Sequence, residues 1–273
     1  MHRKFLDDQA AKMKSEGYSL KKKVVAASSD GGKLAVYVFT DGSGDFDKLV
    51  VWHLKNKDAG KIYIEPSSSF KIELERIHDN GKFPDLYGDG SRTLAYRVVG
   101  GGSKSLRLVR FIGNRAEPEP APMPEGTIAD LDGDGKVEVV TRSLPLGRLY
   151  SIDCGDFHSR AGQNAWKSVV YSWEGGKLVD ASTRYAAWYN EHIAQLEGDI
   201  SGMDPRASQR YGEFMGAALA IYFDHAQKGL PRQGWSRFNE LFRAGDGDPA
   251  GTSDCIRQVK EDVRRRLGVP DGW

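Results

Sequence analysis

One short segment occurs three times in this chain, and that repeat limits the possible folds more than any other feature. The copies read TDGSGDFDKLVVW from Thr40, PDLYGDGSRTLAY from Pro84 and ADLDGDGKVEVVT from Ala129, and they align without gaps at offsets of 44 and 45 residues. The shared columns are Asp41, Asp85 and Asp130, then Gly44, Gly88 and Gly133, then Asp45, Asp89 and Asp134. A period of this length is typical of arrays in which each repeat is one small supersecondary unit.

Each copy leads into a strand-like run of β-branched and aromatic residues, which fit a pleated surface. These runs are 49–52, 93–96 and 137–140. Further strands are expected at 61–65, 71–77, 105–112, 148–152, 168–173 and 177–182. One period would then hold about four short strands, as a propeller blade does, and the third unit would end near Ser182. The 32 glycines of the chain fit a region with many tight turns.

The Pro-rich segment 116–126, AEPEPAPMPEG, lies between the second and third units. Its alternating prolines cannot donate hydrogen bonds to a strand ladder, and they favour an extended conformation. We expect a semi-rigid connector there. The alternative is a ligand for an aromatic groove on another protein.

The third copy offers the oxygen ligands that calcium prefers. Carboxylates at positions 1, 3 and 5 of a loop can surround Ca²⁺ where a glycine at position 6, here Gly135, permits a sharp turn. The expected ligands are Asp130, Asp132, Asp134, the backbone carbonyl of Lys136 and the carboxylate of Glu138. A helix-loop-helix EF-hand is excluded, because Thr141 stands at position 12 and a strand follows the loop. The alternative is that all three copies are only hairpin turns, in which Asp and Gly are favoured for backbone reasons.

With loops of this pattern between strands, residues 30–182 resemble the FG-GAP or VCBS repeats of integrin alpha-subunit propellers and many bacterial surface proteins. Loops of that family read approximately DxDxDGxxD and bind calcium at hairpins, so the resemblance implies the same ligands here, with Glu138 in place of the usual aspartate. Family propellers close with about seven blades, whereas three units fit this chain. A small closed propeller, an open array of sheets and completion by other elements all remain open.

The first two copies depart from the family pattern. In the second, Tyr87 stands at position 3 and Thr93 at position 9, and in the first the departures are Ser43, Phe46 and Leu49. We therefore expect neither of these loops to bind calcium strongly.

From Thr183 the apolar residues recur at the helical period of about 3.6. Four helices are expected, over 185–196, 204–229, 235–242 and 256–267, the second with Asp204 as N-cap and Pro205 at its first position. The predicted fold class is a mainly β N-terminal repeat domain with propeller-like blades, followed by a C-terminal α-helical bundle. The predicted boundaries are an N-terminal segment 1–29, a β-repeat domain 30–182 and a helical domain 183–273.

Composition narrows the kinds of partner. The 39 Lys and Arg residues balance 38 Asp and Glu residues, so the chain has no basic footprint for nucleic acid. No apolar run approaches the roughly 18 to 20 residues of a transmembrane segment. The start, MHRKFLDDQ, has no apolar core of a signal peptide, which fits either a cytoplasmic protein or one whose signal peptide is already removed.

Cys154 and Cys255 can form a disulfide in an oxidising compartment, and two free thiols are the alternative.

No catalytic residue can be assigned from the sequence. Cys154 and His158 are four residues apart, but no orienting group or oxyanion hole accompanies them. The six histidines show no metal-binding spacing, and we expect them to be ordinary polar or half-buried residues. The nucleophile elbow, the Walker loop and the dinucleotide fingerprint are absent.

The sequence therefore favours a calcium-stabilised binding or interaction module over an enzyme. Its partner would be a protein or a polysaccharide, and the resemblance together with the two cysteines favours a periplasmic or secreted location over a cytoplasmic one. Two alternatives remain. One is a hydrolase that acts on envelope or extracellular polymers in a cleft between the domains, and the other is an inhibitor or immunity-type protein.

Overall fold

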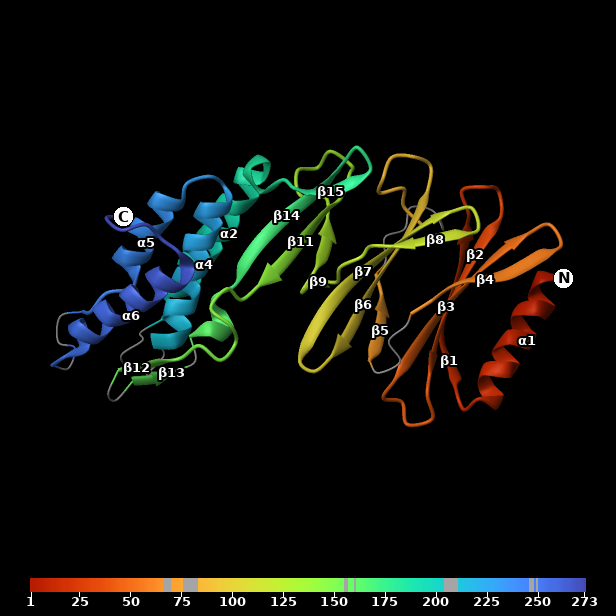
Figure 1. Cartoon of the computed structure of the whole chain (residues 1–273), viewed down its shortest axis with the longest axis horizontal. Helices are drawn as coiled ribbons and strands as arrows, with labels where there is room; N and C mark the ends of the chain where they lie inside the picture. The colour runs from red at the N-terminus through yellow and green to blue at the C-terminus, as the bar shows by residue number, and fades with distance from the viewer. Residues whose placement is uncertain are drawn as a thin grey trace. The chain divides into compact units, whose positions relative to one another are not determined.

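The computed structural model describes residues 1–65, 70–75, 83–154, 157–159, 161–203, 211–245, 248 and 250–273, apart from the side chains of residue 154 and residues 157–159. The described N-terminal part is mainly β, in open sheets, and the C-terminal part is helical (Figure 1). Within the described strands no sheet closes on itself, so a propeller is not shown.

The first sheet is buried on both faces along its two central strands. It has the order β1 (Ser19–Ala27), β2 (Lys33–Thr40), β3 (Asp47–Lys55) and β4 (Asp58–Ile64). Successive side chains of a strand point to opposite faces, so Tyr37, Phe39 and Trp52 line one face of this sheet. Helix α1 (His2–Ser15) covers that face and buries Leu6 and Met13 against it (Figure 1). This cover explains why β2 and β3 are continuous apolar runs and do not alternate with polar residues.

The second sheet packs on the opposite face of the first. Its order is β5 (Lys71–Leu74), β6 (Arg92–Gly100), β7 (Ser103–Ile112) and β8 (Arg115–Pro118), with β9 (Met123–Pro124) also paired to β7. One core cluster joins Val36, Val38 and Val51 of the first sheet to Tyr96 and Val109 of the second. The two sheets therefore share a hydrophobic core, as stacked repeat units do.

The Pro-rich segment is not a free connector, because it forms the edge strands β8 and β9. Pro118 and Pro124 stand at the ends of these strands, where a missing N–H is tolerated. The residues that follow them supply the hydrogen bonds: the amide of Glu119 donates to the carbonyl of Leu108 at 2.9 Å, and that of Glu125 to the carbonyl of Lys104 at 2.8 Å.

The third sheet has the order β10 (Thr127–Ala129), β11 (Glu138–Ser143), β14 (Lys167–Glu174) and β15 (Lys177–Asp180). The predicted hairpin turn between β14 and β15 is confirmed, with φ of 55° at Gly175 and 78° at Gly176. Between β11 and β14 lie the hairpin of β12 (Ile152–Cys154) and β13 (Phe157–Ser159) and the short helix η1 (Gly162–Asn164). The strand predicted at 148–152 is wrong except for its last residue, because Gly147 and Tyr150 donate to turn carbonyls.

All four predicted helices are present in the described residues. They are α2 (Ala186–Ser201), which follows the 3₁₀ turn η2 (Ser182–Tyr185), then α4 (Tyr211–Gln227), α5 (Pro231–Leu241) and α6 (Thr252–Leu267). The predicted N-cap Asp204 and Pro205 lie outside the described residues. Left-handed glycines end α4 and α6, with φ of 87° at Gly229 and 66° at Gly268.

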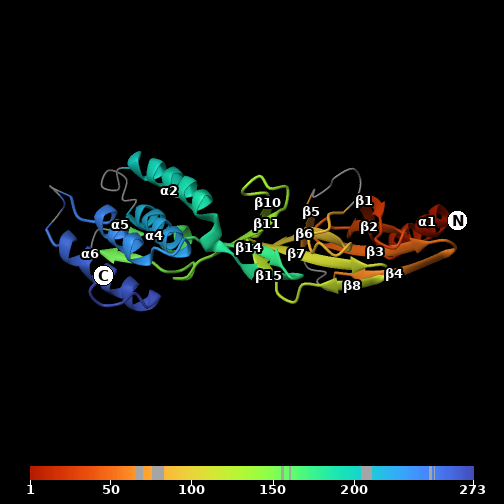
Figure 2. The ribbon, with the colours of Figure 1, turned by 90° about the horizontal axis from the view of Figure 1, so that it is seen from above.

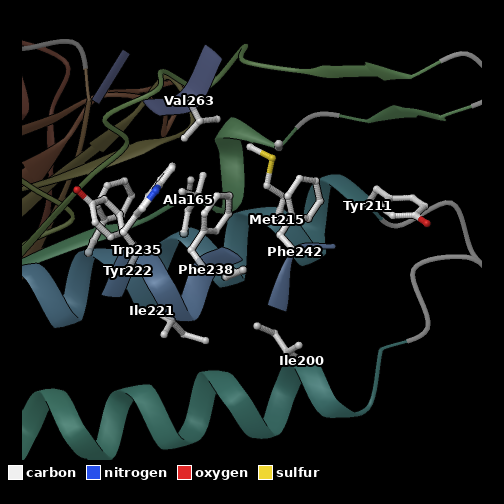
Figure 3. Close-up of a cluster of buried hydrophobic side chains, with 14 of the residues drawn as sticks. Ala165, Ile200, Tyr211, Met215, Ile221, Tyr222, Trp235, Phe238, Phe242 and Val263 are labelled. Carbon is white, nitrogen blue, oxygen red and sulfur yellow. The ribbon is translucent and has the colours of Figure 1, made fainter. Parts of the chain in front are cut away.

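Helix α4 is the centre of the helical part and contacts both α2 and α5 (Figures 1 and 2). Figure 3 shows the aromatic side chains of Tyr222, Trp235, Phe238 and Phe242 gathered around this helix with Met215. None of the described helices is both long enough and apolar enough to cross a membrane.

Small residues recur every four positions in α4, at Gly212, Gly216 and Ala220, and close approach explains one of them. A Cβ added at Gly216 would lie 2.5 Å from the Cβ of Asn164 in η1. The repeated small residues of α4 therefore include a position that packs against a neighbouring turn, as expected for a helix within a folded bundle.

Cys255 on α6 is disulfide-bonded, and its sulfur lies 3.7 Å from the carbonyl of Asp153 on β12. The side chain of Cys154, the other cysteine of the chain, lies outside the described part.

The chain separates into two compact units. The first comprises Met1–Thr127 and Trp173–Leu178, and the second comprises Ile128–Ser172 and Val179–Trp273. The first two copies of the repeated loop therefore lie in the first unit, while the third copy lies in the second unit with all the helices after Ser182. The change from strand to helix falls near the predicted position, between β15 and α2.

Candidate metal centre

All three copies of the repeat form loops that connect neighbouring strands, namely β2 to β3, β5 to β6 and β10 to β11. The glycine at position 4 has a positive φ in every copy: 75° at Gly44, 69° at Gly88 and 76° at Gly133. Residues other than glycine rarely adopt this backbone conformation. The shared glycine column of the sequence is thus a backbone requirement of the loop.

The aspartate at position 1 organises each loop by accepting backbone hydrogen bonds. Asp41 accepts from the amides of residues 45 and 46, and Asp85 from those of residues 89 and 90. In the third loop, the amides of Gly133 and Gly135 donate to the two carboxylate oxygens of Asp130 at 2.7 and 3.0 Å. Part of the Asp/Gly pattern is therefore turn chemistry, which the loops would need with or without a metal.

Only the third loop adds a convergent group of carboxylates. Among the described residues, Asp130, Asp132 and Glu138 each place a carboxylate oxygen within 4.8 Å of the other two. Asp130 and Asp132 are exposed, whereas Glu138 is only 3% exposed. The loop thus presents two carboxylates from the solvent side and one from the protein interior.

Position 9 of the loop points into the interior in every copy, and this makes Glu138 unusual. Leu49 and Thr93 occupy the position in the first two copies, and both are fully buried. The third copy places a carboxylate at the same buried position. A buried charge carries a large desolvation cost unless it is paired or coordinated.

Glu138 has two hydrogen-bond donors in this setting. The amide of Leu131 donates to its Oε2 at 3.0 Å, and the hydroxyl of Tyr185 is hydrogen-bonded to the same carboxylate. Burial raises the pKa of Tyr185, and its hydrogen bond to Glu138 raises it further. Tyr185 lies in η2, directly before α2. The sequence showed Tyr185 only as part of an apolar helical stripe, so its polar role was missed.

The two remaining predicted ligand residues, Asp134 and Lys136, are bonded to each other through groups of Lys136 other than its carbonyl. The Oδ1 of Asp134 accepts from the amide of Lys136 at 2.8 Å, and its Oδ2 lies 3.2 Å from the ammonium group of Lys136. The hydrogen bond from the Lys136 amide is the main reason that the pKa of Asp134 is lowered. The structure therefore brings together three of the five predicted residues, while Asp134 and Lys136 form an exposed pair beside them.

The donor set suits a hard cation. Carboxylate oxygens are the ligands that Ca²⁺ prefers, and they are poor ligands for metals that select thiolate or imidazole. Three carboxylates supply a charge of −3, so a divalent ion would leave the group close to neutral. The exposed side of the loop leaves room for backbone or water oxygens to complete six to eight ligands.

A second polar site, which the sequence did not indicate, lies between two helices. The fully buried Asp224 of α4 places Oδ2 2.6 Å from Nδ1 of His192 on α2, and the imidazole stacks on Trp188. Burial raises the pKa of Asp224, and the hydrogen bond from His192 opposes that rise. Such a pair orients an imidazole, but no described serine or cysteine is hydrogen-bonded to this one. The side chains of the Cys154 and His158 pair lie outside the described residues.

No protein-family model matches this chain, no curated protein matches its sequence significantly, and no solved structure matches its fold significantly. The resemblance to FG-GAP and VCBS repeats therefore rests on the residues of the three loops alone.

Proposed function

We propose that this protein is a calcium-stabilised binding or interaction module built from repeats of the FG-GAP or VCBS type, and not an enzyme. One observation carries the proposal. The third loop buries a carboxylate, Glu138, at a position where the other two loops bury Leu49 and Thr93, and two further carboxylates converge on it.

Electrostatics favours a cation at this group. Like charges within about 5 Å of one another disfavour the shared ionised state, and this repulsion is strongest where one partner is shielded from water. A divalent ion would attract each of the three carboxylates and so offset their mutual repulsion. The amide of Leu131 and the hydroxyl of Tyr185 hold the buried carboxylate in place, so little ordering would remain when the ion binds.

The proposed role of the ion is structural. The loop joins β10 to β11, and its Leu131 packs with Tyr185, Trp188 and Tyr189 in one hydrophobic cluster. A cation held by Glu138 would therefore fix the loop, the start of β11 and the turn that leads into α2 at the same time. A loop with few protein carboxylates favours micromolar to millimolar affinity, which suits a periplasmic or extracellular protein. The partner that such a module would bind is a protein or a polysaccharide.

Thermal unfolding with and without calcium tests the proposal. We expect millimolar calcium to raise the unfolding midpoint of the wild type relative to excess chelator, and we expect Asp130→Asn to lose most of that rise. Asp85→Asn is the matched control, because Asp85 has the same position in the second loop but belongs to no group of three carboxylates among the described residues. An unchanged wild-type midpoint, or equal losses in the two variants, would contradict the proposal.

A further inference from the structure

The second loop contacts a positively charged side chain from another strand. Arg110 of β7 is bound to Asp89 through Nη2, lies 3.3 Å from the hydroxyl of Ser91 through Nε, and lies 3.2 Å from Glu117 through Nη1. Its guanidinium carbon is 4.8 Å from the centre of the Tyr87 ring. The arginine is largely buried, with 23% of its side chain exposed.

The three loop residues that contact this arginine occupy positions 3, 5 and 7 of the repeat. In the third loop, the same positions are held by Asp132, Asp134 and Lys136, which are predicted metal ligands. Tyr87 replaces a carboxylate by a ring whose face attracts a cation. Asp89 keeps the carboxylate, and Ser91 supplies a hydroxyl oxygen. Tyr87, one of the two departures of the second loop from the family pattern, is thus among the residues that receive the guanidinium.

We infer that Arg110 is the resident cation of the second loop and takes the place of a metal ion there. Arginine suits this role because its planar guanidinium stays charged, forms several directed hydrogen bonds and stacks on aromatic rings. The inference rests on the proposed calcium site of the third loop only where it gives the number of metal ions that one chain binds. It makes that count one per chain, and it makes the first unit independent of calcium.

The first loop is also bound by positively charged side chains, which here are lysines. Asp47, at position 7, is fully buried, and its Oδ2 lies 2.6 Å from the ammonium group of Lys21 on β1. The ammonium group of Lys71 on β5 donates to the carbonyl of Gly44 in the same loop. Each loop of the first unit is therefore bound by an ammonium or guanidinium group from another strand.

The stability of the first unit tests the role of Arg110. Arg110→Met removes the charge and keeps most of the apolar stem. Asp89 and Glu117 then lose the guanidinium with which they pair. We expect its unfolding midpoint to fall by about 5 °C, equally in calcium and in chelator. The control is Arg115→Met, because Arg115 also pairs with Glu117, at 2.9 Å, but is 74% exposed. Equal midpoints for the two variants would overturn the inference.

A gain of binding gives a second test that does not depend on the third loop. Tyr87→Asp with Thr93→Glu installs the residues of the third loop at positions 3 and 9 while Arg110 still fills the second loop. Adding Arg110→Ala to this pair should yield one more bound calcium per chain in calorimetric titration, with circular dichroism to confirm folding. If both folded variants bind equal numbers of calcium ions, the inference is wrong. A wild type that binds no calcium would contradict the proposed function, while the difference between the two variants would still decide this inference.

Discussion

The sharpest test of the acidic group is Glu138→Gln, because its effect on stability should change sign with calcium. Glutamine keeps the shape of the side chain, and its carbonyl oxygen can still accept from the amide of Leu131 and the hydroxyl of Tyr185. Only the negative charge is lost. Without metal, that loss removes the desolvation cost of the buried carboxylate and its repulsion from Asp130 and Asp132. With calcium, it removes the one ligand that the interior supplies.

The distances in the structure set the size of both effects. At 4.8 Å, the upper limit for the separation of these carboxylate oxygens, one pair of unit charges repels by about 0.9 kcal/mol in water and by about 3.5 kcal/mol at an effective dielectric constant of about 20. Asp130 and Asp132 are exposed, so the lower figure applies to most of the interaction, and two pairs are relieved. We expect Glu138→Gln to be more stable than the wild type by about 1 to 3 kcal/mol in chelator. Calcium at about 100 times its Kd would stabilise the wild type by about 2.7 kcal/mol and the variant by much less.

Urea unfolding at neutral pH, in chelator and in calcium, measures both differences. Glu191→Gln is the control, since Glu191 is an exposed glutamate of α2 in the same unit. The order of stability between wild type and Glu138→Gln should reverse or become equal when calcium is added. A variant that is less stable than the wild type in chelator, with an unchanged gain from calcium, would refute the electrostatic argument.

Two further predictions concern other parts of the chain. Burial would raise the pKa of Asp30, but hydrogen bonds from His53, Gly32 and Lys55 outweigh it and hold this pKa well below its usual value. The unfolded chain then binds the proton more readily, so Asp30→Asn should cost about 1 kcal/mol at neutral pH. Urea unfolding should show this cost begin to shrink as the pH falls below about 4, the usual pKa of an unfolded aspartate, and continue to shrink toward the lowered pKa of folded Asp30. A cost that is the same at pH 7 and at pH 2 would exclude the ionic contribution. For the cysteines, thiol titration of denatured, unreduced protein should find no free thiol, and reduction should cost about 4 to 5 kcal/mol for a loop of about 100 residues. Two reactive thiols would rule out the bridge.

The local patterns of the sequence identified most strands and helices correctly because each depends on neighbours in the chain. The runs around Leu49, Thr93 and Ser168 are strands, and the residues before Gly229 and Gly268 are helical, as their periodicity predicts. The chain before Ser28 was not recognised as α1 and β1. Its polar residues conceal the few apolar positions, Leu6 among them, that the first sheet buries.

Some features of the candidate metal centre likewise followed from the sequence, and others did not. The repeat columns identified the loop, its glycine at position 4 and its aspartate at position 1, and the calcium-loop spacing of the third copy added the acidic residues at positions 3 and 9. Both follow from spacing within nine residues. The spacing could not show that Asp134 pairs with Lys136, because the same residues fit either an Asp134 that is a metal ligand or an Asp134 that is paired with Lys136. It also gave no sign of Tyr185, which reaches Glu138 from a turn 47 positions later in the chain.

What the sequence by itself determined is the repeat, its period and the loop that can hold calcium, because backbone turns and ligand spacing are short-range properties. Only the tertiary structure decided which charge fills each loop. Arg110, Lys21 and Lys71 reach their loops from other strands, and β-sheet pairing brings distant residues together in ways that local sequence does not encode. The burial that makes Glu138 costly as a bare charge likewise exists only once β11 and the turn before α2 have packed together.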